Sequence, residues 1–295
     1  MQYLIDASVY VFRAYYSMPD DIVDGDGNPV NAFYGYCRFL GDFMEQVRPD
    51  SIAVLFDASL ATSFRTEIYP EYKANREPAP PELKRQFEQC RKYTRALGLL
   101  ECAHPSYEAD DLIGALVTTG RANGLPSTIV SRDKDLAQLV SQNDVFWDFA
   151  GRGQLRYDQI PGVFGVWPEQ IADFLALAGD AVDNIRGVPG VGKKTAAALL
   201  NHFGSLDALY ANLDSVHEVT VRGAKTLAAR LELHKADAML ARKLTGIACD
   251  APVEQPPCGL RPQAPDLGAI NALFDTAGIG TALRRQAVRV ADLCA

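Results

Sequence analysis

The sequence has few of the residues that build disulfide frameworks, zinc sites or membrane spans. Its 295 residues include only six cysteines and four histidines, and no two cysteines stand in a Cys-x-x-Cys motif. This spacing indicates neither a disulfide framework nor a structural zinc site, so we interpret the cysteines as reduced packing residues. No stretch approaches the roughly 18 uncharged residues of a membrane span, and the apolar run at residues 3–5 is too short for the apolar region of a signal peptide. We therefore expect a cytoplasmic protein without a membrane partner.

Basic residues are also in the minority. Lys and Arg number 29 against 37 Asp and Glu, which gives a net charge of −8. This balance argues against a general polyanion binder, because phosphate contacts need Lys and Arg opposite them. Two stretches depart from it: residues 65–95 hold eight basic residues against five acidic ones, and residues 186–243 hold nine against five. Any nucleic-acid site must therefore be local.

Short apolar runs alternate with helical patterns in the first half of the sequence. The runs cover residues 3–5, 51–56, 127–130 and 145–147, and three of them end directly at Asp6, Asp57 or Asp148. Such runs are typical of buried parallel strands. Helical patterns cover residues 32–46, 81–97 and 110–123. The alternation predicts an α/β fold, with a mostly parallel sheet between helices and with the strand-terminal acids meeting at one edge.

Two other regions lack strand patterns. Residues 58–81 form a long segment rich in Pro, Arg, Tyr and Lys, and a loop of this length is usually functional or disordered. After about Pro161 only short helices are indicated, and the tail from Asp266 is expected to form one or two helices that pack back. We expect an α/β core over 1–165, a helical subdomain over 166–250 and a tail over 251–295.

Nine carboxylates are the informative chemical feature. Each alone has an ordinary structural explanation as a helix cap, a first-turn acid or a solvated turn residue. If they crowd together, mutual repulsion would keep several protonated unless cations compensate them. Oxygen-only ligands favour Mg²⁺ or Mn²⁺, and two such ions can clamp the attacking and leaving oxygens of phosphodiester hydrolysis. The nine are Asp6, Asp57, Glu108, Asp110, Asp111, Asp133, Asp135, Asp180 and Asp183.

Six motifs in a fixed order carry a family resemblance. They are Leu4–Ser8, Phe56-Asp57, Phe64-Arg65 with Tyr72–Arg76, Tyr107–Asp111, Arg132–Asp135, and Gly179-Asp180 through Gly187–Thr195. Together they resemble the flap endonuclease / 5′-3′ exonuclease family, including the 5′ nuclease domain that precedes bacterial family A DNA polymerases. The resemblance covers about residues 3–210. It implies a PIN-like 5′ nuclease fold with a helical arch over 58–97 and a C-terminal helix-hairpin-helix subdomain.

The resemblance also implies roles for the nine acids, as ligands of two metal ions, and for two basic residues. Asp6, Asp57, Glu108, Asp110 and Asp111 would serve a first Mg²⁺ or Mn²⁺, and Asp133, Asp135, Asp180 and Asp183 a second. Lys73 and Arg76 would join Asp6, Asp57 and Asp110 in catalysis. Because Lys73 and Arg76 stand three residues apart, we expect them on one side of a helical turn.

DNA contacts are implied at the arch and at the hairpin. The residues are Arg13, Arg65, Tyr72, Lys73, Arg76, Gly187, Val188, Gly190, Val191, Gly192, Lys193, Lys194 and Thr195. Tyr72 would offer a surface on which an unpaired base stacks, and the hairpin glycines would let backbone N–H groups approach a phosphate. A surface salt bridge is the alternative for Arg13, and a solvated amphipathic helix is favoured for residues 84–95. In the family the hairpin also binds a potassium ion.

The sequence departs from the family pattern near the second group of acids. Arg132 stands where glycine is common, Ala181-Val182 replaces serines, and Arg186 replaces a frequent proline. We expect Arg132 to pair with Asp133 or Asp135 and to weaken the second ion.

The function expected is a structure-specific 5′ nuclease of DNA replication and repair, acting as a 5′-3′ exonuclease and a 5′-flap endonuclease. Since only about 85 residues follow Tyr210, we expect a free-standing, monomeric, nucleoid-associated enzyme without a polymerase. A module that binds branched DNA but cleaves weakly is the main alternative. A ribonuclease related to the small acidic-site nucleases is a further one.

Overall fold

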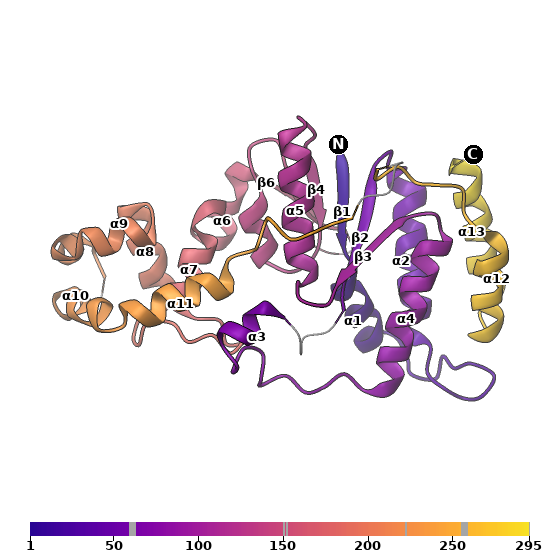
Figure 1. Ribbon diagram of the computed structural model, residues 1–295, viewed down its shortest axis with the longest axis horizontal. Helices are drawn as coiled ribbons and strands as arrows, with labels where there is room; N and C mark the ends of the chain where they lie inside the picture. Colours follow the sequence, from indigo (N-terminus) through magenta and orange to yellow (C-terminus); the bar gives the residue numbers. More distant parts are fainter. Residues whose placement is uncertain (59–62, 150, 152, 222, 255–258, 295) are drawn as a thin grey trace.

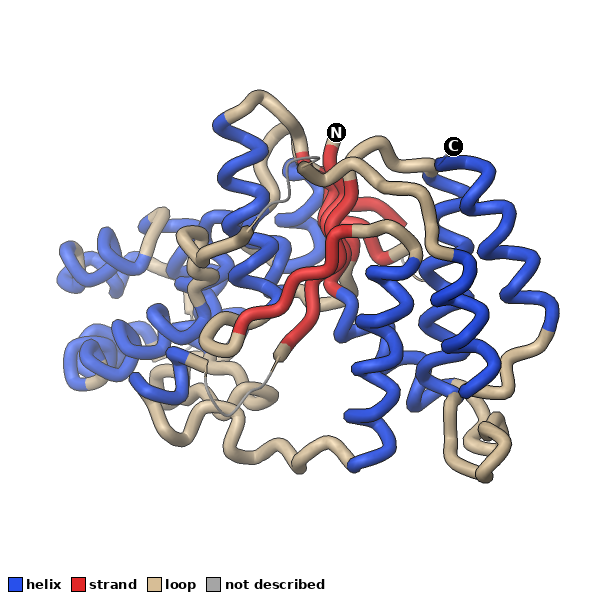
Figure 2. Tube along the Cα trace, turned by 45° about the vertical axis from the view of Figure 1, so that its right-hand side comes forward, coloured by secondary structure: helices blue, strands red, loops and turns tan. Residues whose placement is uncertain are grey.

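A six-stranded sheet forms the centre of the molecule (Figures 1 and 2). The computed structural model describes residues 1–58, 63–149, 151, 153–221, 223–254 and 259–294. The sheet order is β3-β2-β1-β4-β5-β6. The first five strands run parallel and β6 runs antiparallel to β5. The strands are β1 (Gln2–Asp6), β2 (Ile52–Asp57), β3 (Leu100–His104), β4 (Ser127–Val130), β5 (Val145–Asp148) and β6 (Gly153–Arg156).

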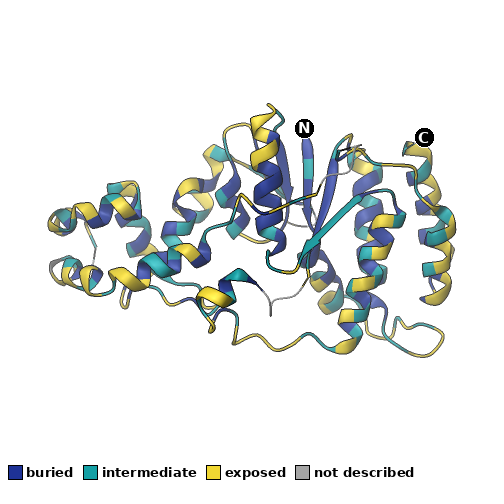
Figure 3. Cartoon of the chain, viewed as in Figure 1, coloured by how far each residue is buried: buried dark blue, intermediate teal, exposed yellow. Residues whose placement is uncertain are grey.

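The middle residues of β1 and β2 are apolar, as expected for strands of a sheet that is covered on both faces. Leu4 pairs in register with Ala53, and Ile5 pairs with Val54. Successive side chains point to opposite faces, so these two pairs belong to two different cores. Figure 3 shows these strands as the most deeply buried part of the chain. Continuous apolar strands of this kind are typical of parallel sheets with helices on both faces, which confirms the expected α/β fold.

Helices cover the two faces unequally. One core lies between the sheet and α1 (Ala7–Ser17), α2 (Asn31–Val47) and α4 (Pro81–Ala96), while α5 (Ala109–Ala122) packs on the other face. The tail forms α12 (Leu267–Thr276) and α13 (Thr281–Cys294), which pack against α4 and α2. In α4, Leu83, Cys90 and Tyr93 are buried while its Lys and Arg lie on the outer side, so this helix is amphipathic.

The segment between β2 and α4 is largely non-helical. It contains the short helix α3 (Phe64–Ile68), and residues 69–80 form turns and extended chain. Residues 59–62 of the expected arch lie outside the described part. Lys73 has a left-handed backbone with φ of +54°, and its N–H donates to the carbonyl of Asp183. The expectation that Lys73 and Arg76 share a helical turn is therefore wrong: a tight turn brings them together, in which the Arg76 N–H donates to the Lys73 carbonyl.

A helical lobe follows the sheet and extends to one side (Figure 1). Its hairpin consists of helix α7 (Ile171–Ala178), a loop and helix α8 (Lys193–Phe203). No helix in the described residues is long and apolar enough to cross a membrane. The five described cysteines are free, and Cys258 lies outside the described residues. The remaining elements are η2 (Asp135–Leu139), η3 (Tyr157–Gln159), α6 (Ile160–Phe164), η4 (Pro168–Gln170), α9 (Leu206–Ala211), η5 (Leu213–Glu218), α10 (Ala224–Leu233) and α11 (Lys235–Thr245).

Candidate active site

Eight of the nine acids meet in one cavity of about 1050 Å³ at the carboxyl edge of the sheet. Two of them end strands β1 and β2, two stand at the start of α5, two follow β4, and two come from the loop between α7 and α8. Asp6 and Asp57 therefore meet as the alternating pattern predicts, whereas Asp148 at the end of β5 is not among the residues that line the cavity. The eight are Asp6, Asp57, Glu108, Asp110, Asp133, Asp135, Asp180 and Asp183.

Burial, together with repulsion between carboxylates, raises the pKa values of three of these acids. Burial and the neighbouring Asp57 raise the pKa of Asp6 to about 8. Burial and the charges of Asp133 and Asp180 raise the pKa of Asp135 to about 8 as well. Burial, followed by Asp133 and Asp6, raises the pKa of Asp110 well above its ordinary value. The acids that line the cavity thus carry more negative charge than the basic side chains around them compensate.

Two serines form hydrogen bonds to the strand-terminal acids, one to a carboxylate and one to a backbone N–H. The Ser131 hydroxyl donates to Asp6 Oδ2 at 2.8 Å and accepts from the Asp133 N–H at 2.9 Å. The Ser8 hydroxyl accepts from the Asp57 N–H at 3.1 Å. Sequence reasoning missed both serines, although each stands one or two residues beyond the end of a strand, where side chains line the same edge. They fix the positions of acids that would otherwise move apart.

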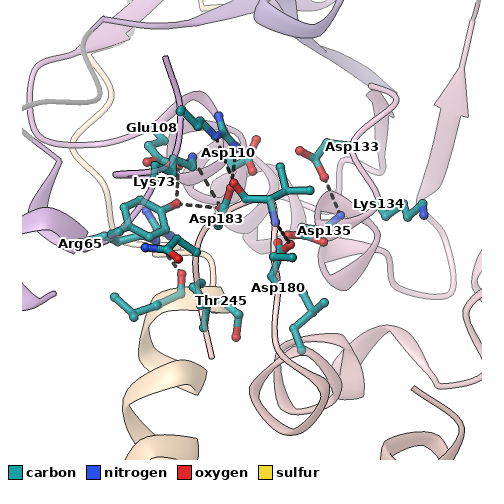
Figure 4. Close-up of a pocket in the computed structure, with 18 of the residues that line it drawn as sticks. Arg65, Lys73, Glu108, Asp110, Asp133, Lys134, Asp135, Asp180, Asp183 and Thr245 are labelled. Carbon is teal, nitrogen blue, oxygen red and sulfur yellow. Dashed lines mark hydrogen bonds and ion pairs between the residues drawn. The ribbon is translucent and has the colours of Figure 1, made fainter. Parts of the chain in front are cut away.

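Two basic side chains, Lys73 and Arg76, make ion pairs with acids of the cavity, and Figure 4 shows Lys73 beside Glu108 and Asp183. The Lys73 ammonium lies 2.8 Å from Glu108 and 3.7 Å from Asp183, and Arg76 makes an ion pair with Asp183. Burial alone would lower the pKa of Lys73, but the charges of Glu108 and Asp183 outweigh it and raise that pKa. Lys73 therefore stays charged beside the carboxylates.

Tyr72 does not offer the stacking surface expected of it. Its side chain is buried, and its hydroxyl lies 3.1 Å from carboxylate oxygens of both Glu108 and Asp183. Burial and these two charges raise the pKa of Tyr72, so the hydroxyl keeps its proton and donates it. Because the Tyr72 ring is buried, it has no free face for an unpaired base. We interpret Tyr72 as a residue that holds Glu108 and Asp183 in position through its hydroxyl.

Asp111 is the acid that does not reach the cavity, and its assignment as a metal ligand is wrong. Arg65 binds it with two hydrogen bonds of 2.7 Å, while the N–H groups of Glu108 and Ala248 donate to the same carboxylate. Both side chains are buried. The expected DNA contact of Arg65 is also wrong, since its guanidinium is committed to Asp111 and to the carbonyls of Leu244 and Gly246.

Arg132 has a different partner from the one expected. Its Nε lies 3.4 Å from Asp148, at the end of β5, and no ion pair joins it to Asp133 or Asp135 within the described residues. The prediction that Arg132 pairs with Asp133 or Asp135 is therefore wrong. Arg13 does line the cavity, and one of its terminal nitrogens is buried without a hydrogen-bond partner in the described structure.

The hairpin between α7 and α8 presents only part of the set expected to touch DNA. Val188 and Val191 have buried side chains, and their N–H groups already donate to Leu177 and Val188 within the lobe. Neither the side chains nor the N–H groups of Val188 and Val191 are therefore open to the DNA contact expected of these residues. Gly187 packs against Gly179 so closely that a Cβ on either would clash with the other's backbone.

The remaining hairpin residues face solvent at the start of α8. Gly190, Gly192, Lys193 and Lys194 are exposed and Thr195 is partly exposed. Gly192 has open space where a Cβ would stand, so a ligand can approach its backbone closely. The first N–H groups of a helix have no partner within it and attract anions. This end of α8 is therefore suited to a phosphate group.

The donor set of the cavity fits divalent cations, although its side chains would have to reorient to bind them. In the described part of the chain, no group of three or more His, Cys, Asp or Glu side chains is arranged to hold a metal ion as it stands. Repulsion separates these acids, and Lys73 and Arg76 draw Glu108 and Asp183 to themselves. Glu108 Oε1 is nevertheless buried with no hydrogen-bond partner in the described residues, and every donor is an oxygen, as Mg²⁺ and Mn²⁺ prefer.

Comparison with known proteins gives matches over nearly the whole chain. Residues 1–160 match a family model described as the 5′-3′ exonuclease N-terminal resolvase-like domain, and residues 166–267 match the 5′-3′ exonuclease C-terminal SAM fold. DNA polymerase I of Pseudomonas aeruginosa is 41% identical over 92% of this chain, and that of Bacillus caldotenax is 36% identical over 96%. The chain spans only 30% and 32% of the length of these two relatives.

Solved structures resemble the whole fold at low sequence identity. A T5 5′-exonuclease with bound divalent zinc ions has a TM-score of 0.67 at 18% identity, with 100% of this chain and 99% of that chain covered. The catalytic core of Rad2 in complex with a DNA substrate has a TM-score of 0.63 at 13% identity, with coverages of 100% and 91%. At these identities the likeness shows the fold alone.

Proposed function

Since the chain belongs to the 5′-3′ exonuclease family, we propose that it is an active structure-specific 5′ nuclease that cleaves DNA at 5′ ends and 5′ flaps. One observation carries the proposal: eight carboxylates line a single cavity, with Lys73 and Arg76 facing them. A structural role alone does not explain so much buried negative charge, because mutual repulsion destabilises the fold that holds it. The polymerase activity of the longer relatives is not part of this proposal.

We propose that the cavity binds two divalent cations, Mg²⁺ or Mn²⁺. Asp6, Asp57, Glu108 and Asp110 would hold one ion, and the four acids Asp133, Asp135, Asp180 and Asp183 would hold the other. Bound ions of this kind lower the pKa of a water ligand and stabilise charge on the oxygens of a phosphodiester. The bound divalent zinc of the T5 5′-exonuclease supports a metal-dependent reaction.

The protein side chains would bind and orient the substrate. Lys73 supplies a point charge and Arg76 a planar fork for the phosphate at the cleaved bond. Ser131 and Ser8 would keep Asp6 and Asp57 in place while the phosphate enters. The exposed start of α8, with Lys193 and Lys194, would grip the backbone of the duplex without reading its sequence. The carbonyls of the hairpin loop 187–192 would bind a potassium ion.

A flap cleavage assay tests this function. Wild-type protein with Mg²⁺ is expected to cut a 5′-flap DNA, and Asp110→Ala is expected to lose about a thousandfold in rate, because the ions contribute several kcal/mol to the transition state. Asp42→Ala, which removes an acid outside the cavity, is the matched control and should keep full activity. Full activity in Asp110→Ala would refute the metal assignment.

The same assay separates the main alternatives. Protein that shifts a flap duplex in a gel but leaves it intact with Mg²⁺ and Mn²⁺ would indicate a branched-DNA-binding module. Faster cleavage of an RNA flap than of a DNA flap would indicate a ribonuclease.

We further propose that the protein is a monomer and that it works on DNA in the cytoplasm, at the nucleoid. Sedimentation with and without a flap duplex tests whether it is a monomer.

A further inference from the structure

Two segments that are distant in sequence lie against each other at the mouth of the cavity. The first, residues 69–76, is called the arch segment here, and the second, residues 180–186, is called the hairpin-entry loop. The Asn184 side-chain amide donates to the Glu71 carbonyl at 2.7 Å. The Asn75 side-chain amide donates to the Ala181 carbonyl at 2.9 Å. Each segment thus contributes one asparagine that binds the backbone of the other.

Lys73 lies between these two cross-links. Its N–H donates to the Asp183 carbonyl at 3.0 Å, and its ammonium contacts Glu108 and Asp183. The backbone of Lys73 is left-handed, with φ of +54°. Residues other than glycine, asparagine and aspartate seldom adopt this conformation, and it persists only where neighbouring contacts hold it. The two asparagine bonds are such contacts, because they fix the chain two residues before and two residues after Lys73.

Asn184 has a matching conformation on the opposite segment. Its φ is +58°, which asparagine tolerates better than most residues. The conformation turns its side chain away from its own loop and toward Glu71. Both asparagines are at least partly exposed, so their hydrogen bonds add little to the stability of the whole fold. Their geometry instead determines how the arch segment is seated on the hairpin-entry loop.

We propose that Asn75 and Asn184 are positioning residues that hold Lys73 and Arg76 over the carboxylates and couple this placement to the hairpin. The inference rests on the proposed function, in which Lys73 and Arg76 contact the phosphate. The hairpin-entry loop leads directly into the exposed start of α8 through Gly187, which packs on Gly179. A duplex seated on α8 therefore fixes the loop to which the arch segment is tied. Binding of the duplex and placement of the Lys73 and Arg76 side chains are therefore coupled.

The first test needs neither DNA nor activity. Trypsin cuts after Lys73 and Arg76, so the rate of cleavage there, followed by mass spectrometry, reports how firmly the arch segment is held. Asn184→Gly keeps the left-handed backbone but removes the amide, and Asn75→Ala removes the other one. Both variants should be cut severalfold faster than wild type at these two bonds, with an unchanged melting temperature. Cleavage at the wild-type rate in the double variant would overturn the proposal.

Asn201→Ala is the matched control. Asn201 is exposed and its amide also donates to a carbonyl, that of Gly165 at 3.0 Å, but it lies within the helical lobe. Its loss should leave cleavage after Lys73 and Arg76 unchanged. Equal acceleration in Asn201→Ala would mean that the asparagines of the arch segment and the hairpin-entry loop have no specific role.

The second test measures the reaction on a flap substrate. Asn184→Gly should lower kcat by about 10- to 100-fold, because a misplaced catalytic group is costly, while KM changes little. In a Lys73→Ala/Arg76→Ala background the same substitution should have almost no further effect, since both residues through which Asn184 acts are gone. An undiminished effect in that background would refute the coupling. If the wild type proves inactive, the proposed function fails, and the trypsin experiment still decides whether the asparagines hold the arch segment.

Discussion

Asp110 and Asp111 are neighbours in the first turn of α5, yet the charges around them have opposite signs. Asp111 points toward the core, where Arg65 and two N–H groups supply four hydrogen bonds. Asp110 points into the cavity, where the nearest charges are other acids and its pKa is raised. The role of an acid is therefore set by the segment that folds against it, and not by the motif in which it stands.

The difference also separates stability from chemistry. A buried carboxylate with a bidentate guanidinium is compensated, and its loss leaves an unpaired charge inside the protein. The acids of the cavity are compensated only in part, by Lys73 and Arg76, so they weaken the fold until a cation or a proton arrives. Substitutions on the two sides of α5 should therefore have opposite consequences.

Removing Arg65 should give the largest effect on folding. Arg65→Ala leaves Asp111 buried without its partner, so the free energy of unfolding should fall by about 3 to 5 kcal/mol, measured by urea denaturation. Asp110→Asn is the control on the other side of the helix turn, and should leave that free energy unchanged or higher because it removes repulsion. A loss of stability in Asp110→Asn as large as that in Arg65→Ala would abolish the contrast.

The pH dependence of stability sharpens the same comparison. Because the pKa values of Asp6 and Asp135 are about 8 in the folded chain, folded protein keeps protons that the unfolded chain releases above about pH 4. The free energy of unfolding should therefore fall as the pH rises from about 5 to 8. In EDTA the melting temperature should drop by a few degrees over this range.

Saturating Mg²⁺ should flatten or reverse that slope, since the ions bind the ionised carboxylates and only in folded protein. The Asp6→Asn/Asp135→Asn variant is the control and should show a flatter profile in EDTA. A wild-type melting temperature in EDTA that rises over the whole range would contradict the assignment of the protons to the cavity.

Substitution of Arg132 should give the smallest effect, a minor change in metal affinity. Since its Nε is paired with Asp148, Arg132→Gly should change the affinity for Mn²⁺ by less than about threefold, in line with a half-exposed ion pair. Isothermal titration calorimetry measures this affinity. A gain of an order of magnitude would show that Arg132 competes with the ion after all.

The sequence predicted the sheet best where its strands are apolar on both sides. The run 127–130 coincides with β4, and the acids after β1 and β2 lie where expected. By contrast β3 and β6 escaped notice, because they are edge strands with polar residues such as Glu101, His104 and Gln154. Edge strands need bury less of their surface, so their residues show no apolar run.

The acids that form the site could be predicted from the sequence, but the side chains and carbonyls that pair with the site residues could not. Arg65 and Asp111 are separated by 46 residues, and nothing in either motif indicates that they meet. Arg132 was expected beside Asp133 because it precedes it, whereas the backbone turn directs its side chain to Asp148. The left-handed conformation of Lys73 depends on a carbonyl more than a hundred residues away, and no local pattern specifies such a contact.

The anchoring of α3 and α4 limits what can pass under the chain between them. Arg65 fixes α3 to the end of α11 and to α5, and α4 is packed against α2. Only residues 69–80 connect the two anchors, and twelve residues have a contour length of at most roughly 40 Å. That length limits how far the chain can stand away from its anchors, so the fold itself limits the size of anything that passes beneath it.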